Sequence, residues 1–319
     1  TIEAVGGKMT VFIPALVISV LGFYIINLVS NSVGIYPDSF WFFPLYLTVC
    51  VIFVVEFWMI FYSINQSAKT MKTTAELNIQ QSMLPCIFPA FPEREEFDVF
   101  ATMDPAKEVG GDFYDFFMVD DSHLAIVVAD VSGKGVPAAL FMVIGKTLIK
   151  DHTQPGRDLG EVFTEVNNLL CESNSEGLFI TAFEGVLDLV TGEFRFVNAG
   201  HEIPFLCKKG AGFEPYKIRA GFVLAGMEGI RYRCGSMQLE PGDRIFQYTD
   251  GVTEATNKAN ELYGMERLQT VLCQNISLAP SELLLKIKSD IDTFVGDAPQ
   301  FDDITMLCLE YKGRNGDYQ

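Results

Sequence analysis

Acidic residues recur where predicted strands end or where glycines adjoin them, and these positions could bind metal ions. The apolar run 124–129 ends at Asp130, which is followed by Val131-Ser-Gly-Lys-Gly. A glycine turn after a strand fixes a carboxylate in place and lets backbone carbonyls approach the same cation. Comparable combinations occur at Glu108-Val-Gly-Gly-Asp112, at Asp250-Gly251 and at Asp302-Asp303.

Together, these four clusters predict a binuclear Mg²⁺ or Mn²⁺ site. Hard divalent cations take oxygen ligands, and carboxylates that lie close together repel one another unless cations separate them. Each cluster alone carries little information, because Asp-Gly is usually a turn and paired acids before a strand are usually solvated. The prediction therefore depends on a fold that brings the strand ends together.

The elements that would position these acids are mostly strands, and four helices interrupt them irregularly. Hairpin signals such as Thr191-Gly192 favour antiparallel sheets flanked by helices, an α+β fold, over a doubly wound parallel sheet. The predicted strands are 98–103, 113–119, 124–129, 179–189, 193–197, 232–239, 244–248 and 304–311. The predicted helices are 136–151, 159–173, 263–274 and 280–295.

Seven motifs in this region form an ordered set: EVGGDFYDF, ADVSGKGVPAALFM, FITAFEGVLD, FVNAGHEIPFL, YTDGVTEA, LYGMERL and FDDIT. The set resembles the SpoIIE-like branch of the PPM-type, metal-dependent serine/threonine protein phosphatases. The resemblance implies a central antiparallel β-sandwich with helices on both outer faces. It also implies phosphoserine or phosphothreonine hydrolysis on a small regulatory phosphoprotein, of the type that antagonises an anti-sigma factor in signal transduction.

The same resemblance implies a role for each acid. Asp130 would bridge two Mn²⁺ or Mg²⁺ ions, with the carbonyl of Val131 on one of them, and a water between the ions would attack phosphorus in line. The remaining metal ligands would be Asp112 on the Val131 side, and Asp250 and Asp302 on the other, with Asp303 beside them. Asp130, Asp250 and Asp302 would be the catalytic set.

Three further residues are candidates for contacts with the metal ligands or the substrate: Glu108, Lys134 and His201. Lys134 would meet the substrate phosphate or be a solvated turn residue. His201 would act as a general acid or be structural. The sequence departs from the family pattern at Glu202, Val223 and Ala225, which bears on substrate fit and not on metal binding.

The first 64 residues predict a membrane anchor. Mean hydropathy is +0.23 although 20% of residues are charged, so apolar residues are concentrated somewhere. Uncharged or nearly uncharged stretches at about 9–30 and 40–64 are long enough to be transmembrane helices. The loop between them contains Asp38 and no Lys or Arg, whereas Lys8 and Lys69 flank the outer ends. The positive-inside rule then predicts that both ends of this segment face the cytoplasm. Together with the family resemblance, this implies a multi-pass protein of the bacterial inner membrane with the catalytic domain in the cytoplasm.

Residues 65–85 predict a linker helix, because this stretch contains no Gly or Pro before Pro85. An approximate heptad spacing at 64, 68, 71, 75 and 78 leaves open a homodimer through this helix or a passive spacer. The phosphatase-like domain would occupy 86–313 and a tail 314–319. The sequence does not begin with Met, so a longer natural N-terminus with further spans or a sensor is compatible with it.

Composition excludes several other functions. The net charge of −18 argues against nucleic-acid binding, and seven cysteines without a CxxC pair argue against a zinc or dithiol site. Two alternatives stay open: a catalytically inactive, membrane-tethered binding module, and an enzyme similar to diguanylate cyclases, suggested by Gly110-Gly-Asp-Phe-Tyr. A cyclase would not account for the later Asp250 and Asp302 clusters.

Overall fold

The computed structural model describes residues 94–107, 110–172 and 174–313, together with single helical positions between 22 and 63. The chain divides into two compact units, Thr1–Ile79 and Gln80–Gln319. The linker helix 65–85, the tail 314–319 and most positions of the two predicted spans lie outside the described residues. Among the residues that are described, no helix has the length and apolar character needed to span a bilayer. The membrane anchor and the linker therefore stay predictions.

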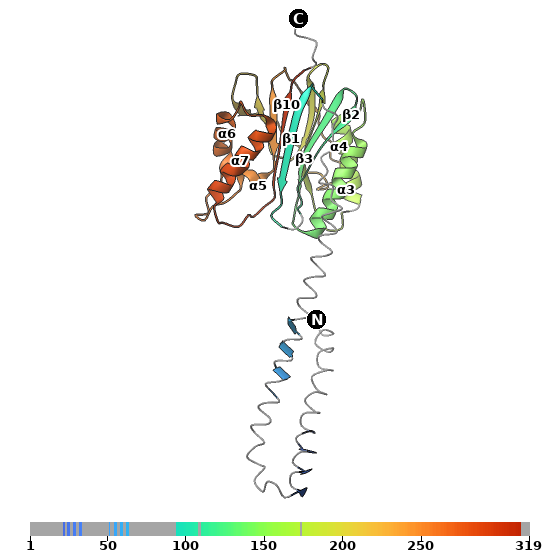
Figure 1. The fold of residues 1–319 in the computed structure, drawn as a ribbon. Helices are drawn as coiled ribbons and strands as arrows, with labels where there is room; N and C mark the ends of the chain where they lie inside the picture. Colours follow the sequence, from blue (N-terminus) through green and yellow to red (C-terminus); the bar gives the residue numbers. More distant parts are fainter. Residues whose placement is uncertain are drawn as a thin grey trace. The chain divides into compact units, whose positions relative to one another are not determined.

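Two five-stranded antiparallel sheets form the second unit, and helices cover both outer faces (Figure 1). This confirms the predicted α+β sandwich. One sheet has the order β1 (Phe97–Asp104), β10 (Ile304–Tyr311), β9 (Arg244–Tyr248), β6 (Phe205–Cys207), β7 (Phe213–Pro215). The other has the order β2 (Phe113–Asp120), β3 (His123–Val131), β4 (Ile180–Asp188), β5 (Glu193–Ala199), β8 (Gly235–Gln238). The helices are α3 (Val136–His152), α4 (Leu159–Glu172), α5 (Asp250–Thr253), α6 (Gly264–Gln274) and α7 (Pro280–Val295).

Strand β3 shows why the sequences of the central strands are continuous apolar runs. Successive side chains of a strand point to opposite faces of the sheet. Leu124, Ile126 and Val128 lie in the core between the two sheets, whereas Ala125 and Val127 pack in the core beneath α3 and α4. Because both faces are covered, every side chain in this stretch must be apolar.

The topology brings four chain segments to one end of the sandwich. In the β2–β3 pair, Phe113 lies opposite Ala129, so the residue before β2 meets the last residues of β3. In the β9–β10 pair, Tyr248 lies opposite Met306, so the end of β9 meets the beginning of β10. Antiparallel pairing therefore gathers the sequence clusters around Asp112, Asp130, Asp250 and Asp302.

The structure also differs from the predicted elements in detail. The four predicted helices occur within one residue of their predicted bounds. The predicted strand 232–239 is shorter, because only Gly235–Gln238 pairs with β5. Strands β6 and β7 were not predicted, since three-residue strands are too short to show alternation.

Candidate active site

Asp112 is a buried carboxylate that residues from the opposite sheet orient. Thr249 Oγ1 and Thr305 Oγ1 donate hydrogen bonds of 2.7 and 2.6 Å to its Oδ2. Burial raises the pKa of Asp112 well above its usual range, and the charge of Asp130 raises it further. Asp112 is thus held in one orientation next to a second acid.

Asp130 stands at the centre of the acidic cluster. Burial and the charge of Asp250 raise its pKa from 3.8 to about 7, and the charges of Asp302 and Asp303 add to this effect. A hydrogen bond with the side chain of Asp112 opposes the rise. Asp130 therefore interacts electrostatically with acids from each of the three other clusters.

Asp250 opens helix α5 and lies among further acids. Burial raises its pKa, and the charges of Glu254 and Asp302 raise it further, while Lys134 opposes them. Burial and the charges of Asp250 and Glu254 likewise raise the pKa of Glu202. The departure from the family pattern at Glu202 therefore adds a carboxylate beside the predicted metal ligands.

Lys134 brings a positive charge to this cluster. It follows Gly133, in the turn between β3 and α3, and its Nζ lies 2.9 Å from Asp302 Oδ2. The ammonium also donates a hydrogen bond of 2.5 Å to the carbonyl of Phe301 and lies 4.1 Å from the centre of that ring. The Gly133 turn and the loop before β10 are thus joined through one side chain.

Asp303 is engaged by the backbone of the turn that precedes β2. Its Oδ1 accepts a hydrogen bond of 2.8 Å from Ala106 N, and its Oδ2 accepts bonds of 2.8 and 3.4 Å from Gly111 N and Asp112 N. A Cβ at Gly110 would lie 2.3 Å from Asp303 Oδ2. The first glycine of the Gly-Gly-Asp motif is therefore required for this carboxylate to reach the turn.

The second glycine of that motif lies against the end of β3. A Cβ at Gly111 would lie 2.8 Å from the carbonyl oxygen of Val131, so only glycine allows the turn to approach the carbonyl that the resemblance assigns to a metal. Glu108, the remaining candidate of this cluster, lies outside the described residues.

His201 is buried behind the acids and does not ionise near neutral pH. Its Nδ1 lies 2.9 Å from Thr181 Oγ1, and Thr181 is the β4 residue opposite Asp130. Burial lowers the pKa of His201 to about 3, so the ring is neutral. This favours the structural alternative over a general-acid role.

Sequence reasoning did not single out three residues that shape the site: Thr181, Thr249 and Thr305. The threonines in the YTDG and DDIT motifs were visible, but only the structure shows that both donate to Asp112. Conversely, Asp115 is not part of the acidic cluster. Its Oδ2 lies 3.2 Å from Lys150 Nζ and 3.8 Å from Lys146 Nζ, so it joins β2 to α3.

The donor set suits hard divalent cations. Asp112, Asp130 and Asp250 all have raised pKa values caused partly by neighbouring carboxylates, which is the repulsion that bound cations would relieve. The described side chains do not form a preassembled group of three or more ligands around one point. The fit therefore rests on the chemistry and electrostatics of the acids.

Comparison with known proteins identifies the domain. Residues 120–312 match the family model described as Stage II sporulation protein E (SpoIIE). The chain belongs to this family. Protein IcfG of Synechocystis sp. (strain ATCC 27184 / PCC 6803 / Kazusa) is 33% identical over 72% of this chain and 40% of its own length. Phosphoserine phosphatase RsbU of Bacillus subtilis is 30% identical over 74% of this chain and 68% of its own length.

Solved structures share the fold of this SpoIIE-family domain. The SiaA-PP2C domain of Pseudomonas aeruginosa is 22% identical, with a TM-score of 0.67 over 77% of this chain and 98% of that one. RsbX, solved in complex with magnesium, is 17% identical, with a TM-score of 0.53 over 69% of this chain and 98% of that one. The unit that carries the acidic cluster therefore has the fold of a PP2C-type phosphatase domain.

Proposed function

We propose that this chain is a membrane-anchored phosphatase that uses two divalent cations, Mn²⁺ or Mg²⁺, to hydrolyse phosphoserine or phosphothreonine on a small regulatory phosphoprotein. The observation that carries the proposal is the convergence of Asp112, Asp130, Asp250 and Asp302 at one end of the sandwich. The substrate class is supported by the similarity to RsbU, whose name describes it as a phosphoserine phosphatase. The resemblance to the family supports an antagonist of an anti-sigma factor as that phosphoprotein.

We assign the proposed ligands to two sets that share Asp130, following the family resemblance. Asp112 and the Val131 carbonyl would hold one cation, and Asp250 and Asp302 the other, with Asp130 shared between them. When bound, the cations would supply a water of lowered pKa for in-line attack on phosphorus. RsbX, which has the same fold, was solved with magnesium, and this supports the metal requirement.

Other side chains would position these ligands and the substrate. Thr249 and Thr305 hold the carboxylate of Asp112 in one orientation through its Oδ2. Asp303 accepts hydrogen bonds from backbone amides of the turn before β2. We therefore assign it the role of positioning that turn, and not of binding a cation directly. Lys134 lies at the edge of the cluster, where its ammonium could bind a substrate phosphate oxygen.

We also propose that the N-terminal segment anchors the domain in the bacterial inner membrane through two spans, with the catalytic domain in the cytoplasm. Among the described positions of the two segments, Tyr24, Ile25 and Leu28 expose 56–65% of their surface, and Trp58 and Met59 expose 46 and 55%. Large apolar side chains exposed on helices are typical of surfaces that face lipid or another helix. The linker helix would then act as a dimer contact or a spacer.

One assay tests the activity itself. The detergent-solubilised chain should hydrolyse p-nitrophenyl phosphate and a phosphoserine protein when Mn²⁺ is added, and should lose activity when the ion is chelated. Asp130→Asn should abolish hydrolysis, whereas Asp151→Asn, which changes an exposed acid on α3, should retain it. If the unmodified chain binds Mn²⁺ but hydrolyses neither substrate, the alternative of an inactive, membrane-tethered binding module is favoured.

A further inference from the structure

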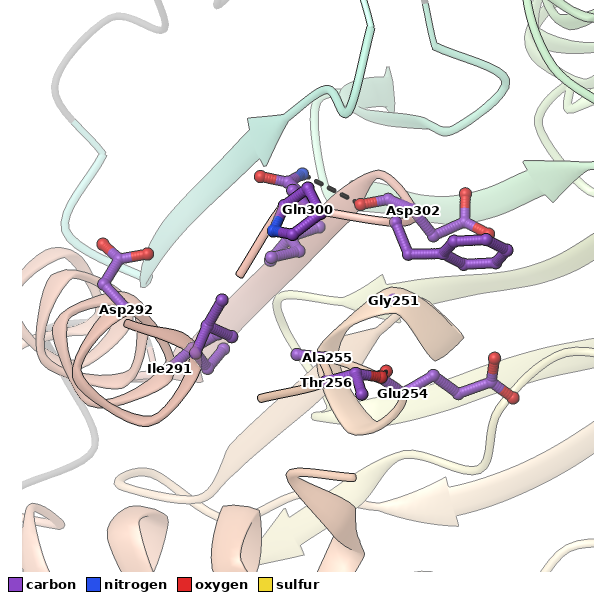
Figure 2. A pocket seen from close by; sticks show the side chains of 12 residues that line it. Gly251, Glu254, Ala255, Thr256, Ile291, Asp292, Gln300 and Asp302 are labelled. Carbon is purple, nitrogen blue, oxygen red and sulfur yellow. Dashed lines mark hydrogen bonds between the residues drawn. The ribbon is translucent and has the colours of Figure 1, made fainter. Parts of the chain in front are cut away.

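A hollow that is partly open to solvent adjoins the proposed catalytic acids. It lies between the end of α7, helix α5 and the loop before β10 (Figure 2). Asp302 belongs both to this hollow and to the acidic cluster, and Gly251 follows Asp250 directly. A substrate whose phosphate reached the cluster would therefore have neighbouring residues within reach of the hollow.

The two uncharged polar side chains around the hollow are already bonded to the protein. Gln300 Nε2 donates hydrogen bonds of 2.8 Å to the carbonyls of Asp104 and Asp302, the second of which is drawn in Figure 2. Thr256 Oγ1 donates to the carbonyl of Glu254 at 2.7 Å. Besides these and three acids, the lining is apolar and comes from Gly251, Ala255, Ile291, Val295, Pro299, Phe301 and Ile304. The surface that stays available to a ligand is thus mainly hydrocarbon.

Phe301 lies at the rim as an exposed aromatic side chain. The residue exposes 74% of its surface, and the ammonium of Lys134 lies 4.1 Å from the centre of its ring. Exposing a large aromatic surface is unfavourable unless something covers it. Lys134 also contacts Asp302, so one side chain joins this lining residue of the hollow to the catalytic cluster.

The charge around the hollow is negative. Its lining includes Glu254, Asp292 and Asp302 and no basic residue. Lys288 pairs with Asp292 and Lys134 with Asp302, whereas within the described residues Glu254 has no ion-pair partner. In Figure 2, Glu254 and Asp302 lie on the same side of the hollow, opposite Ile291 and Asp292. An acidic segment would be repelled here, and a basic residue would be attracted.

We propose that this hollow is a subsite of the phosphatase that receives a large apolar side chain of the phosphoprotein substrate, close to its phosphorylated residue and beside a basic residue. The proposal rests on the proposed phosphatase function. The occupant must belong to the substrate, because the hollow shares Asp302 with the catalytic cluster and its negative rim complements a basic segment. A subsite of this kind selects among phosphoproteins without altering the chemistry at phosphorus.

The test uses phosphopeptides that carry one phosphoserine in an alanine background. A single Leu is placed in turn at each position within three residues of the phosphoserine, and kcat/KM is measured with the detergent-solubilised chain and Mn²⁺. We expect one position at which Leu raises kcat/KM about tenfold over Ala, as partial burial of one leucine side chain would give. At a position next to this Leu, a peptide with Arg should have a higher kcat/KM than a peptide with Glu.

Matched variants test whether the preference for Leu arises in the hollow. Ala255→Leu fills it from the wall and should reduce the preference for Leu to less than about threefold. Ala259→Leu adds the same side chain to an exposed turn outside the hollow and should keep the tenfold preference. If Ala255→Leu does not fold, Phe301→Ala takes its place, because an exposed ring contributes little to the core; it should also reduce the preference.

The outcomes separate the subsite from the activity. Equal kcat/KM for all flanking residues, with p-nitrophenyl phosphate still hydrolysed, overturns the subsite and leaves the phosphatase function standing. An equal loss of preference in Ala255→Leu and Ala259→Leu also overturns the subsite. Failure to hydrolyse any phosphate ester with Mn²⁺ overturns the proposed function, and the subsite with it.

Discussion

Replacing Glu184 by Gln should remove a loss of stability that the unmodified domain undergoes as the pH rises. Glu184 lies in β4, and its side chain is fully buried beneath α3. Thr153 Oγ1 lies 2.7 Å from Glu184 Oε1 and 2.8 Å from the carbonyl of Ile149. The single hydroxyl proton of Thr153 is shared between these two acceptors, and its donation to Oε1 favours the ionised carboxylate, so this contact offsets only part of the effect of burial.

The magnitude follows from proton linkage. Burial raises the pKa of Glu184 from 4.5 to about 8, and the contact with Thr153 opposes this only in part. Between these two values the folded state holds a proton that the unfolded state has released. The free energy of unfolding therefore falls by about 1.4 kcal/mol per pH unit in this window, or about 3 kcal/mol from pH 5 to pH 7.5. The loss is complete above the folded pKa and absent below the unfolded one.

Urea unfolding of the compact unit 80–319, followed by far-ultraviolet circular dichroism, measures this effect. The neutral amide of Glu184→Gln cannot ionise, so the variant should gain about 3 kcal/mol relative to the unmodified unit between pH 5 and pH 7.5. Glu193→Gln, which changes an exposed acid on β5, should follow the unmodified curve. Parallel curves for Glu184→Gln and the unmodified unit would refute the reasoning.

Three further predictions concern the site and the anchor. Gly110→Ala places a Cβ 2.3 Å from Asp303 Oδ2, so it should cost about 2–4 kcal/mol in urea unfolding; a loss below 0.5 kcal/mol, roughly the level of surface substitutions, would contradict the tight fit. Thr305→Val removes a hydrogen bond of 2.6 Å to Asp112 and should raise the Mn²⁺ concentration for half-maximal activity at least about fivefold. The exposed control Thr270→Val should not change that concentration, and an unchanged value in both variants would argue against the orientation of Asp112. A topology reporter fused at Asp38 should be found outside the cytoplasm and one at the C-terminus inside it, and a cytoplasmic reporter at Asp38 would refute the two-span arrangement.

The secondary structure and the identity of the acids could be read from the sequence because both depend on local patterns. The apolar run 124–129 predicted a strand buried on both faces, and β3 is such a strand. Helix α7 begins at Pro280 and ends at Val295, as predicted, because Pro favours the first helical turn and a glycine follows the last. The acids were recognisable because each adjoins a glycine or a strand end.

The roles of individual carboxylates depend on contacts between residues that are far apart in the chain. Asp303 accepts a hydrogen bond from Gly111 across 192 residues, and Thr305 donates to Asp112 across 193. No local pattern distinguishes Asp303, which holds a turn, from its neighbour Asp302, which contacts Lys134. The sequence by itself therefore determined the longer strands, the four longer helices and the set of candidate acids, since periodicity and turn chemistry act over a few residues. Only the tertiary structure decided which acids face one another, because burial and mutual repulsion arise when the ends of four strands meet.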